Sequence, residues 1–292
     1  MIKLKTLFLI PILFFSNQVM SECILKMGYT TESRKPMIQK SPDNSGVYYD
    51  LYTLAATKIG CKLIIERNSK KRILQKLKYG FIDFYSEALF TTQRSKYSYF
   101  IDNGLVTREY GITPLRFSEI TSYTDVQSLE LVWLLERGSS KKEIVQKLRI
   151  QTHQVNYVDI EKVLLLFETR GVNFYVANKA MIDSFTYNRP SYFLEYNGIK
   201  LHNRCCGSMR PMLLAFSKKS KHYFSQSNLL YKKSNSPSFT NQSEVPLAGS
   251  VVYKFKEALE DLKREGKPQY LYEKHLKYNW KDSLKTLTIE NG

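Results

Sequence analysis

The strongest candidate for a binding group is Arg94, which ends the polar turn Thr91-Thr92-Gln93-Arg94. A guanidinium offers two parallel N–H donors that match the two oxygens of a carboxylate. The turn follows a predicted strand over 81–85, and open α/β sheets place their binding crevice beyond the carboxyl ends of the strands. We therefore expect Arg94 to bind an anionic ligand group. We also expect Arg94→Ala to leave the melting of the ligand-free protein nearly unchanged, because the side chain would be held for the ligand.

Catalytic and metal chemistry have little support in the residue types. The four histidines are scattered along the chain, and they form no Ser-His-Asp or metal-ligand arrangement: His153, His202, His222 and His275. A zinc site would need Cys and His in tighter clusters than this chain offers. We expect no catalytic residue, no cofactor and no metal.

The elements that position Arg94 alternate between strand and helix. Apolar residues at Leu51, Leu54 and Ala55 keep helical spacing, and Gly60 and Gly80 follow two of the helices as C-caps. This order is typical of a mostly parallel α/β sheet. The predicted elements are a strand at 23–30, a helix at 48–59, a strand at 62–65, a helix at 70–78 and a strand at 81–85.

A second unit repeats the pattern, with a Gly-Ser-Ser turn at 138–140 before a helix. Residues 217–249 are rich in Ser, Lys, Asn and Pro, and they predict a long surface loop or insertion. The elements expected here are strands at 130–135, 172–177 and 212–216, and helices at 141–148, 159–169 and 251–265.

The N-terminus predicts export. Lys3 and Lys5 precede an apolar run over 7–15, and a polar stretch ends at Ser21. This is typical of a secretory signal peptide, and the run is shorter than the roughly 20 residues of a membrane span. We expect cleavage near Ser21 and a soluble periplasmic protein.

The formal net charge of +17 is compatible with an anionic ligand. Lysines are spread along the whole chain rather than clustered, which favours a solvated basic surface over a nucleic-acid interface. No finger-type Cys/His spacing and no aromatic RNA-binding motif is present in the sequence. We expect no nucleic-acid partner.

Four cysteines in an exported chain allow three pairings. Cys23 and Cys61 each open a short predicted strand, so neighbouring parallel strands would bring them together in an oxidising compartment. We predict a Cys23–Cys61 disulfide. Cys205 and Cys206 could form a bridge between adjacent residues, stay reduced or pair elsewhere.

An ordered series of segments resembles a known family. The densest part runs from Gly46-Val-Tyr-Tyr-Asp50-Leu through Leu77-Lys-Tyr-Gly80-Phe-Ile-Asp83 to Thr92-Gln-Arg94. Segments 121–148 and 258–276 resemble the second-lobe opening and the closing helices of the same family. The series is similar to the amino-acid-type periplasmic solute-binding proteins of bacterial import systems, the extracellular solute-binding proteins of family 3.

The resemblance implies an α/β fold of two lobes, the type II periplasmic-binding-protein fold, with the ligand in a cleft between them. Each lobe would be a mostly parallel sheet flanked by helices. The implied division is a signal peptide at 1–21, a first lobe at 22–107 and 205–292, and a second lobe at 108–204.

The resemblance also implies site residues. The counterpart of Arg94 in the family pairs with the ligand's α-carboxylate. Ser139 and Ser140 match the second-lobe loop, where free N–H groups at a helix start favour an anion. Ser86 falls where the family has cleft-lining groups.

Three positions depart from the family pattern: Asn178, Glu87 and Leu89. Asn178 falls at or near the place of an Asp that holds the ligand's ammonium, which puts a free α-amino acid in doubt. Glu87 stands where a small polar residue is common. Arg72 is a candidate for the cleft, with an exposed helical position as the alternative. For Tyr29 and Arg34, on the first-strand loop, core or surface roles are as well supported as ligand contact.

The resemblance implies a monomeric binding protein that captures a small carboxylate-bearing solute by hinge closure. An inner-membrane ABC transporter permease or a receptor would be its partner. The alternatives are a sensory module that presents its ligand to a receptor, and a dehydratase-like enzyme on the same fold. A dehydratase needs a general acid, which Asn178 cannot supply.

Overall fold

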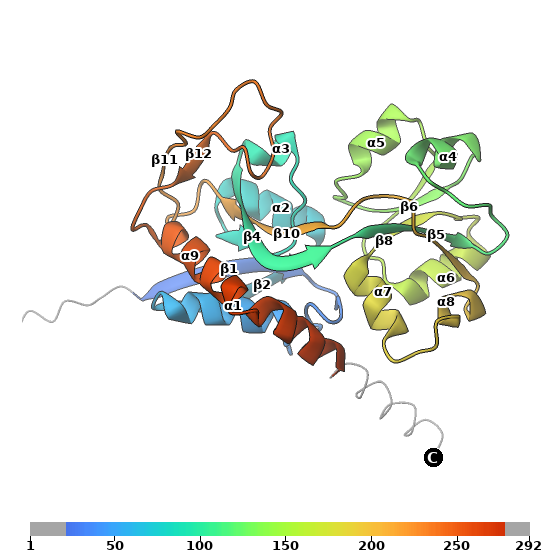
Figure 1. Cartoon of the computed structure of the whole chain (residues 1–292), viewed down its shortest axis with the longest axis horizontal. Helices are drawn as coiled ribbons and strands as arrows, with labels where there is room; N and C mark the ends of the chain where they lie inside the picture. The colour runs from blue at the N-terminus through green and yellow to red at the C-terminus, as the bar shows by residue number, and fades with distance from the viewer. Residues whose placement is uncertain (1–21, 278–292) are drawn as a thin grey trace, which may run out of the picture.

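The computed structural model describes residues 22–277, arranged as two α/β lobes side by side (Figure 1). The predicted signal peptide at 1–21 lies outside the described residues. The described part contains no helix that is long and apolar enough to cross a membrane. The α/β class and the two lobes expected from the sequence are confirmed, but the sheets are not mostly parallel: two of the four strand pairs in the first-lobe sheet are antiparallel, and β5 of the second lobe pairs only antiparallel. The lobe boundaries at 107–108 and 204–205 stay predictions.

The first lobe is built on a five-stranded sheet in the order β2-β1-β3-β10-β4. β1 pairs in parallel with β2 and β3, and β10 runs antiparallel to β3 and β4. Helices α1 and α9 contact each other, and α2 packs on β1. The elements are β1 (Cys23–Thr30), α1 (Val47–Lys58), β2 (Cys61–Asn68), α2 (Lys70–Tyr79), β3 (Phe84–Tyr85), α3 (Thr92–Ser95), β4 (Ser98–Thr107), β10 (Arg210–Ser217) and α9 (Val251–Arg264).

The start of α1 depends on Gly46. Its φ of 141° lies in the region that glycine favours, and an added Cβ would come within 2.6 Å of the Met37 carbonyl oxygen. This close approach ties the loop after β1 to the helix start, since Tyr48 also donates its backbone N–H to Met37 at 3.0 Å. The loop that enters the interlobe space is therefore fixed by local packing.

The second lobe places β5 between β8 and β9, antiparallel to both, while β6 and β7 pair in parallel. A parallel bridge from Trp133 to Phe174 joins these two small sheets. The elements are β5 (Glu109–Pro114), α4 (Tyr123–Ser128), β6 (Trp133–Glu136), α5 (Lys142–Lys147), β7 (Thr152–Val155), α6 (Ile160–Thr169), β8 (Tyr175–Asn178), α7 (Lys179–Thr186), α8 (Phe193–Tyr196) and β9 (Ile199–His202).

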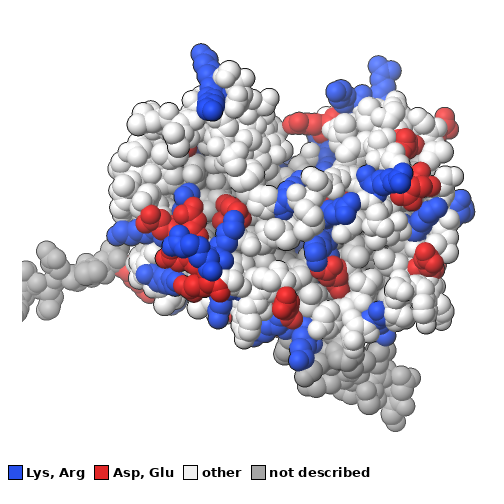
Figure 2. All heavy atoms as spheres, in the orientation of Figure 1, with Lys and Arg blue, Asp and Glu red and all other residues white. Residues whose placement is uncertain are grey.

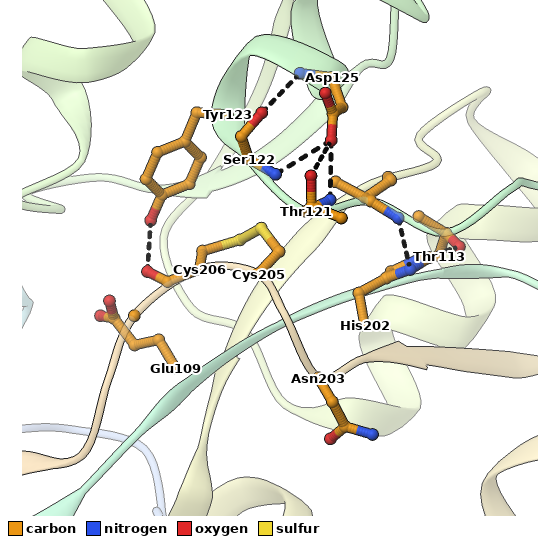
Figure 3. The surroundings of a disulfide bond; sticks show 12 residues. Glu109, Thr113, Thr121, Ser122, Tyr123, Asp125, His202, Asn203, Cys205 and Cys206 are labelled. Carbon is orange, nitrogen blue, oxygen red and sulfur yellow. Dashed lines mark hydrogen bonds between the residues drawn. A yellow bond between two sulfur atoms is a disulfide. The ribbon is translucent and has the colours of Figure 1, made fainter.

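Two stretches of chain cross between the lobes. The first runs from β4 directly into β5, and the second follows β9 and leads into β10 (Figure 1). The second crossing contains a Cys205–Cys206 disulfide, one of the alternatives that the sequence left open. Gly111 donates its backbone N–H to the Cys205 carbonyl at 3.0 Å, and the Tyr123 hydroxyl donates to the Cys206 carbonyl at 3.2 Å (Figure 3). These contacts attach the two crossings to each other and to α4.

The segment 217–249 is more ordered than the predicted loop. It contains a short antiparallel pair, β11 (Ser225–Ser227) and β12 (Glu244–Pro246). The Gln242 side chain accepts from the Phe100 backbone N–H at 2.8 Å and donates to the Phe100 carbonyl at 2.9 Å. The Gln242 side chain thus makes the two backbone hydrogen bonds that a neighbouring strand would make with β4. The Ser- and Asn-rich composition of the segment does not predict this order.

Cys23 and Cys61 are joined by a disulfide. They are direct partners in the parallel register of β1 and β2, with a Cα–Cα distance of 4.5 Å. The bond therefore connects the first residues of two neighbouring strands, as the sequence predicts.

Replacing both Cys23 and Cys61 by alanine should lower the free energy of unfolding by up to about 4 kcal/mol, the loop-entropy value for the 38-residue separation. Urea denaturation followed by circular dichroism measures this loss. The matched control is the Cys205→Ala/Cys206→Ala pair, which closes no long loop and should cost less. Equal losses in the two double variants would contradict the loop-entropy account.

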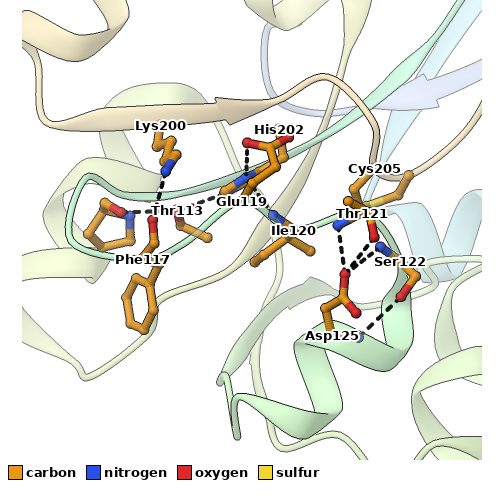
Figure 4. Close-up of polar contacts among 12 residues, drawn as sticks. Thr113, Phe117, Glu119, Ile120, Thr121, Ser122, Asp125, Lys200, His202 and Cys205 are labelled. Atoms are coloured by element: carbon orange, nitrogen blue, oxygen red, sulfur yellow. Dashed lines mark hydrogen bonds and ion pairs between the residues drawn. A yellow bond between two sulfur atoms is a disulfide. The ribbon is translucent and has the colours of Figure 1, made fainter.

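A buried histidine fixes the start of the second lobe. His202 is fully buried, and its Nδ1 accepts the Ile120 backbone N–H at 3.0 Å while its Nε2 lies 2.8 Å from the Thr113 hydroxyl (Figure 4). The half-exposed Glu119 carboxylate is 3.2 Å from Nδ1 and would favour a protonated ring. Burial dominates and lowers the pKa of His202, because a buried position disfavours the charged ring. The neutral ring is therefore the folded form.

Lowering the pH from 7.5 to 5.5 should destabilise the protein through His202. The unfolded chain takes up a proton near the ordinary histidine pKa of about 6.5, and the folded chain does not, so unfolding becomes easier as the pH falls. His202→Gln keeps an acceptor and a donor but does not titrate, and it should show a weaker pH dependence. Denaturant unfolding at the two pH values measures the free energy of unfolding of each protein. An identical change in this free energy between pH 7.5 and 5.5 for wild type and variant would refute the prediction.

Candidate ligand-binding site

Two adjoining cavities lie between the lobes, and both lobes contribute to their walls. The polar cavity has a volume of about 120 Å³, and its charged lining comprises Arg34, Lys70, Glu87, Arg94, Glu109, Glu136, Lys141 and Arg210. The large cavity has a volume of about 610 Å³. Arg34, Glu87, Asn178 and Met212 line both cavities. The two cavities therefore adjoin at these four residues.

An ion cluster joins the lobes across the polar cavity. Glu136, at the end of β6 in the second lobe, forms ion pairs with Arg34 and with Lys70 of the first lobe, the latter at 2.5 Å. All three side chains are less than one-fifth exposed. Burial alone would raise the pKa of Glu136, but the charges of Arg34 and Lys70 outweigh it and hold that pKa below its ordinary value. Tyr157 adds a hydrogen bond between the lobes, from its hydroxyl to the Ser33 carbonyl at 2.9 Å.

Arg94 lies at the same junction, positioned by the short helix α3. The Thr91 hydroxyl caps this helix by accepting the Arg94 backbone N–H at 3.1 Å. The Arg94 guanidinium donates to the Leu89 carbonyl at 3.1 Å and, across the lobes, to the Gly138 carbonyl at 3.2 Å. It is 8% exposed, and it makes no ion pair with any residue in 22–277. The structure thus corrects the premise that Arg94 has no role in the ligand-free protein.

A second ion cluster stands at the crossing strands. Glu109 accepts from Lys141 at 2.6 Å and from Arg210 at 2.9 Å. Glu109 and Arg210 belong to the two crossings, so their pairing ties these strands together. The Lys141 ammonium also lies 5.6 Å from the centre of the Tyr123 ring, within cation–π range.

Glu87 is held by a buried tyrosine. The Tyr29 hydroxyl donates to the Glu87 carboxylate at 3.0 Å. Burial, with the adjacent Glu87 charge, raises the pKa of Tyr29 well above its ordinary value, so the phenol stays protonated and able to donate. Glu87 is consequently fixed at the junction of the two cavities.

Five of the seven ligand-site residues predicted from the sequence line the polar cavity: Glu87, Arg94, Ser139, Ser140 and Asn178. The structure places Ser86 and Arg72 elsewhere. Ser86 is fully buried and lines neither cavity, and its carbonyl accepts from the Tyr52 hydroxyl. Arg72 is exposed on α2 and lines neither cavity. Asn178 has a structural contact as well, because its side chain accepts the Met181 N–H at 2.9 Å and caps α7.

The sequence analysis missed Lys70, Glu109, Glu136, Lys141 and Arg210, and it left the role of Arg34 open. A signal existed for Lys70. It lies three and seven positions before the buried Ile73 and Leu77 and therefore shares their face of α2, whereas Arg72 does not. The acidic partners had no comparable signal, because Glu109 and Glu136 acquire their role from contacts that only the folded lobes create.

The remaining charges are dispersed. On the face shown in Figure 2, Lys and Arg side chains lie over both lobes and are interspersed with Asp and Glu. Within residues 22–277, no group of three or more His, Cys, Asp or Glu side chains is arranged to hold a metal ion. The cleft is thus the place where charged side chains of both lobes converge.

No protein-family model matches the sequence, and no curated protein matches it. Solved structures do match its fold. An ancestral arginine-binding protein bound to arginine has 18% sequence identity and a TM-score of 0.60, covering 86% of this chain and 97% of its own. An amino acid ABC transporter substrate-binding protein from Streptococcus pneumoniae bound to L-arginine has 15% identity and a TM-score of 0.62, covering 88% and 95%. An ancestral amino-acid-binding protein, described as a precursor of cyclohexadienyl dehydratase, has 14% identity and a TM-score of 0.59, covering 87% and 95%.

These likenesses extend over both lobes and nearly the full length of each compared chain, at identities that establish the fold. The protein therefore has the two-lobe, type II periplasmic-binding-protein fold of the amino-acid-binding proteins.

Proposed function

We propose that this protein is a solute-binding protein that captures a small carboxylate-bearing ligand between its lobes. One observation carries the proposal: the Arg94 guanidinium of the first lobe lies against the Gly138–Ser140 turn of the second, 3.2 Å from the Gly138 carbonyl. Arg94, Ser139 and Ser140, the residues predicted to bind an anion, all line one cavity, which supports the proposal. The Ser139 backbone N–H is itself not free, because it donates to the Glu136 carbonyl at 2.9 Å. Closure of the lobes would bury an anion between them.

Delivery to an inner-membrane ABC transporter from the periplasm, by a monomer, is part of the proposal. The predicted signal peptide supports export. Among proteins of the same fold, the one from Streptococcus pneumoniae is described as an amino acid ABC transporter substrate-binding protein. An amino acid or a related carboxylate is the ligand class that follows from this likeness and from Arg94.

Binding without conversion is the mode of action we favour. A dehydratase-like reaction needs a general acid in the second lobe, and the amide of Asn178 has no acidic proton to give. Its oxygen is also engaged in capping α7. The fold itself accommodates both activities, as the dehydratase precursor illustrates.

A thermal-shift screen of amino acids and simple carboxylates, followed by calorimetry, tests this function. We expect at least one carboxylate to bind with one-to-one stoichiometry and to be recovered unchanged, as judged by NMR. Binding only by neutral or cationic solutes would overturn the carboxylate assignment, and turnover of the ligand would overturn the non-enzymatic one.

A further inference from the structure

The polar cavity has little unpaired positive charge. Glu136 neutralises Arg34 and Lys70, and Glu109 pairs with Lys141 and Arg210. Of the cationic side chains that line this cavity, Arg94 is the one that has only neutral carbonyl partners within residues 22–277. Since the cavity measures about 120 Å³, it has room for one small anionic group rather than a whole ligand.

The large cavity has the size and lining of a site for an organic molecule. Its volume of about 610 Å³ falls within the range of roughly 300–1,000 Å³ that small-molecule sites occupy. Both lobes supply apolar side chains to its wall, among them Met37, Tyr157, Met181, Phe185, Phe193 and Met212. Methionine side chains adapt to irregular apolar shapes, and aromatic rings offer large apolar faces.

The charges of the large cavity give no preference for a second anion. Arg34, Lys35 and Arg189 line this cavity together with Glu87, Asp159 and Glu161, so its cations do not outnumber its carboxylates. Arg34 is already paired with Glu136, and the Asp159 carboxylate caps α6 by accepting the Lys162 N–H at 2.8 Å. The wall therefore combines apolar side chains with no excess of positive charge, while the adjoining polar cavity offers Arg94.

We infer that the ligand is an amphiphilic monoanion whose carboxylate binds at Arg94 and whose apolar body occupies the large cavity. The four residues common to both cavities would lie at the boundary between head and body. This inference rests on the proposed carboxylate-binding function and adds the ligand class: a carboxylic acid with an apolar chain or ring. Binding of the body follows from removing apolar surface from water.

A series of straight-chain carboxylates from acetate to decanoate, each below its micelle concentration, tests the inference by calorimetry. Affinity should rise about fourfold for each added methylene, the factor expected for burying one CH₂. Decylamine, which has the same apolar chain and a cationic head, should bind much more weakly than decanoate. Acetate should be the weakest carboxylate of the series.

Met181→Gln places a polar group of similar shape in the wall of the large cavity, and it should flatten the dependence of affinity on chain length. The matched control is Leu165→Gln, on the exposed side of α6 at 56% exposure, which should leave the whole series unchanged. Binding that depends on Arg94 but not on chain length would overturn this inference and leave the proposed function standing. If decylamine binds as tightly as decanoate, and if Arg94→Ala does not change the affinity of either compound, the proposed anion site would be overturned.

Discussion

Replacing Glu136 by glutamine is expected to open the ligand-free protein. The change leaves Arg34 and Lys70 buried between the lobes without their shared counter-charge. Removing one partner of a buried ion pair typically costs about 3–5 kcal/mol, because the remaining charge is left desolvated. Rotation at the crossing strands exposes both cations to water, so the closed arrangement bears most of this cost. Small-angle X-ray scattering should show a larger radius of gyration for Glu136→Gln than for wild type.

A matched control separates lobe opening from general loss of charge. Glu66 pairs with Lys76 within the first lobe, and both side chains are about one-third exposed. Glu66→Gln should therefore leave the radius of gyration unchanged. Glu136→Gln should lower the free energy of unfolding by clearly less than it lowers the free energy of lobe closure, because each lobe keeps its own core. An unchanged scattering profile for Glu136→Gln would show that the ion cluster does not hold the lobes together.

Acid should act on wild type in the same direction. The pKa of Glu136 is lowered in the closed form, so the stabilisation from this group is present above its ordinary pKa of about 4.5 and is lost as the pH falls through the lowered value. Scattering at decreasing pH should show wild type opening only below the ordinary glutamate pKa of about 4.5. Glu136→Gln should already be open at neutral pH, with little further change.

The first lobe could be predicted from its sequence because its signals are local. The strand predicted at 23–30 agrees with β1, and the helix predicted at 70–78 agrees with α2 to within one residue. α2 has a buried apolar stripe of helical period and Gly80 as its C-cap, while β1 begins at Cys23 and is mostly buried. The crossing strands β4 and β5 were not predicted, because their pairing partners lie far along the chain and no turn separates them.

The site could be predicted only in part, for the same reason. Arg94, Ser139 and Ser140 have family-like local surroundings, and the structure brings them into one cavity. Glu136 looks like the last residue of a buried strand, and nothing next to it in sequence indicates that Arg34 and Lys70 will face it. Contacts between lobes depend on how the crossings orient them, which local patterns do not encode.

Arg94 gives the largest effect expected on ligand binding. Truncating one partner of a buried, bidentate charge-assisted pair typically costs about 2–5 kcal/mol, or roughly 30- to several-thousand-fold in affinity. Arg94→Ala should lose binding by a factor in this range. Arg94→Lys should recover part of it at most, because an ammonium lacks the planar fork that matches a carboxylate.

The ligand-free protein should also respond, contrary to the expectation from sequence. The Arg94 guanidinium donates to the Leu89 and Gly138 carbonyls, and hydrogen bonds from charged groups contribute about 1.5–3 kcal/mol. Arg94→Ala should therefore lower the melting temperature measurably without ligand. The matched control is Arg72→Ala, an exposed arginine on α2 outside both cavities, which should alter neither melting nor affinity.

Calorimetric titration of the carboxylate found by the screen into wild type, Arg94→Lys, Arg94→Ala and Arg72→Ala decides between two roles for Arg94. If it binds the ligand, affinity should fall in the order wild type, Arg94→Lys, Arg94→Ala, and the loss should persist at temperatures where every variant is fully folded. If Arg94 only joins the lobes through Gly138, its variants should melt at lower temperature and show a larger radius of gyration in scattering. Saturating ligand should then restore closure. The affinity, corrected for the shifted opening equilibrium, should equal that of wild type. Equal corrected affinities would move the anion site away from Arg94, to the ion-paired cations of the same cavity.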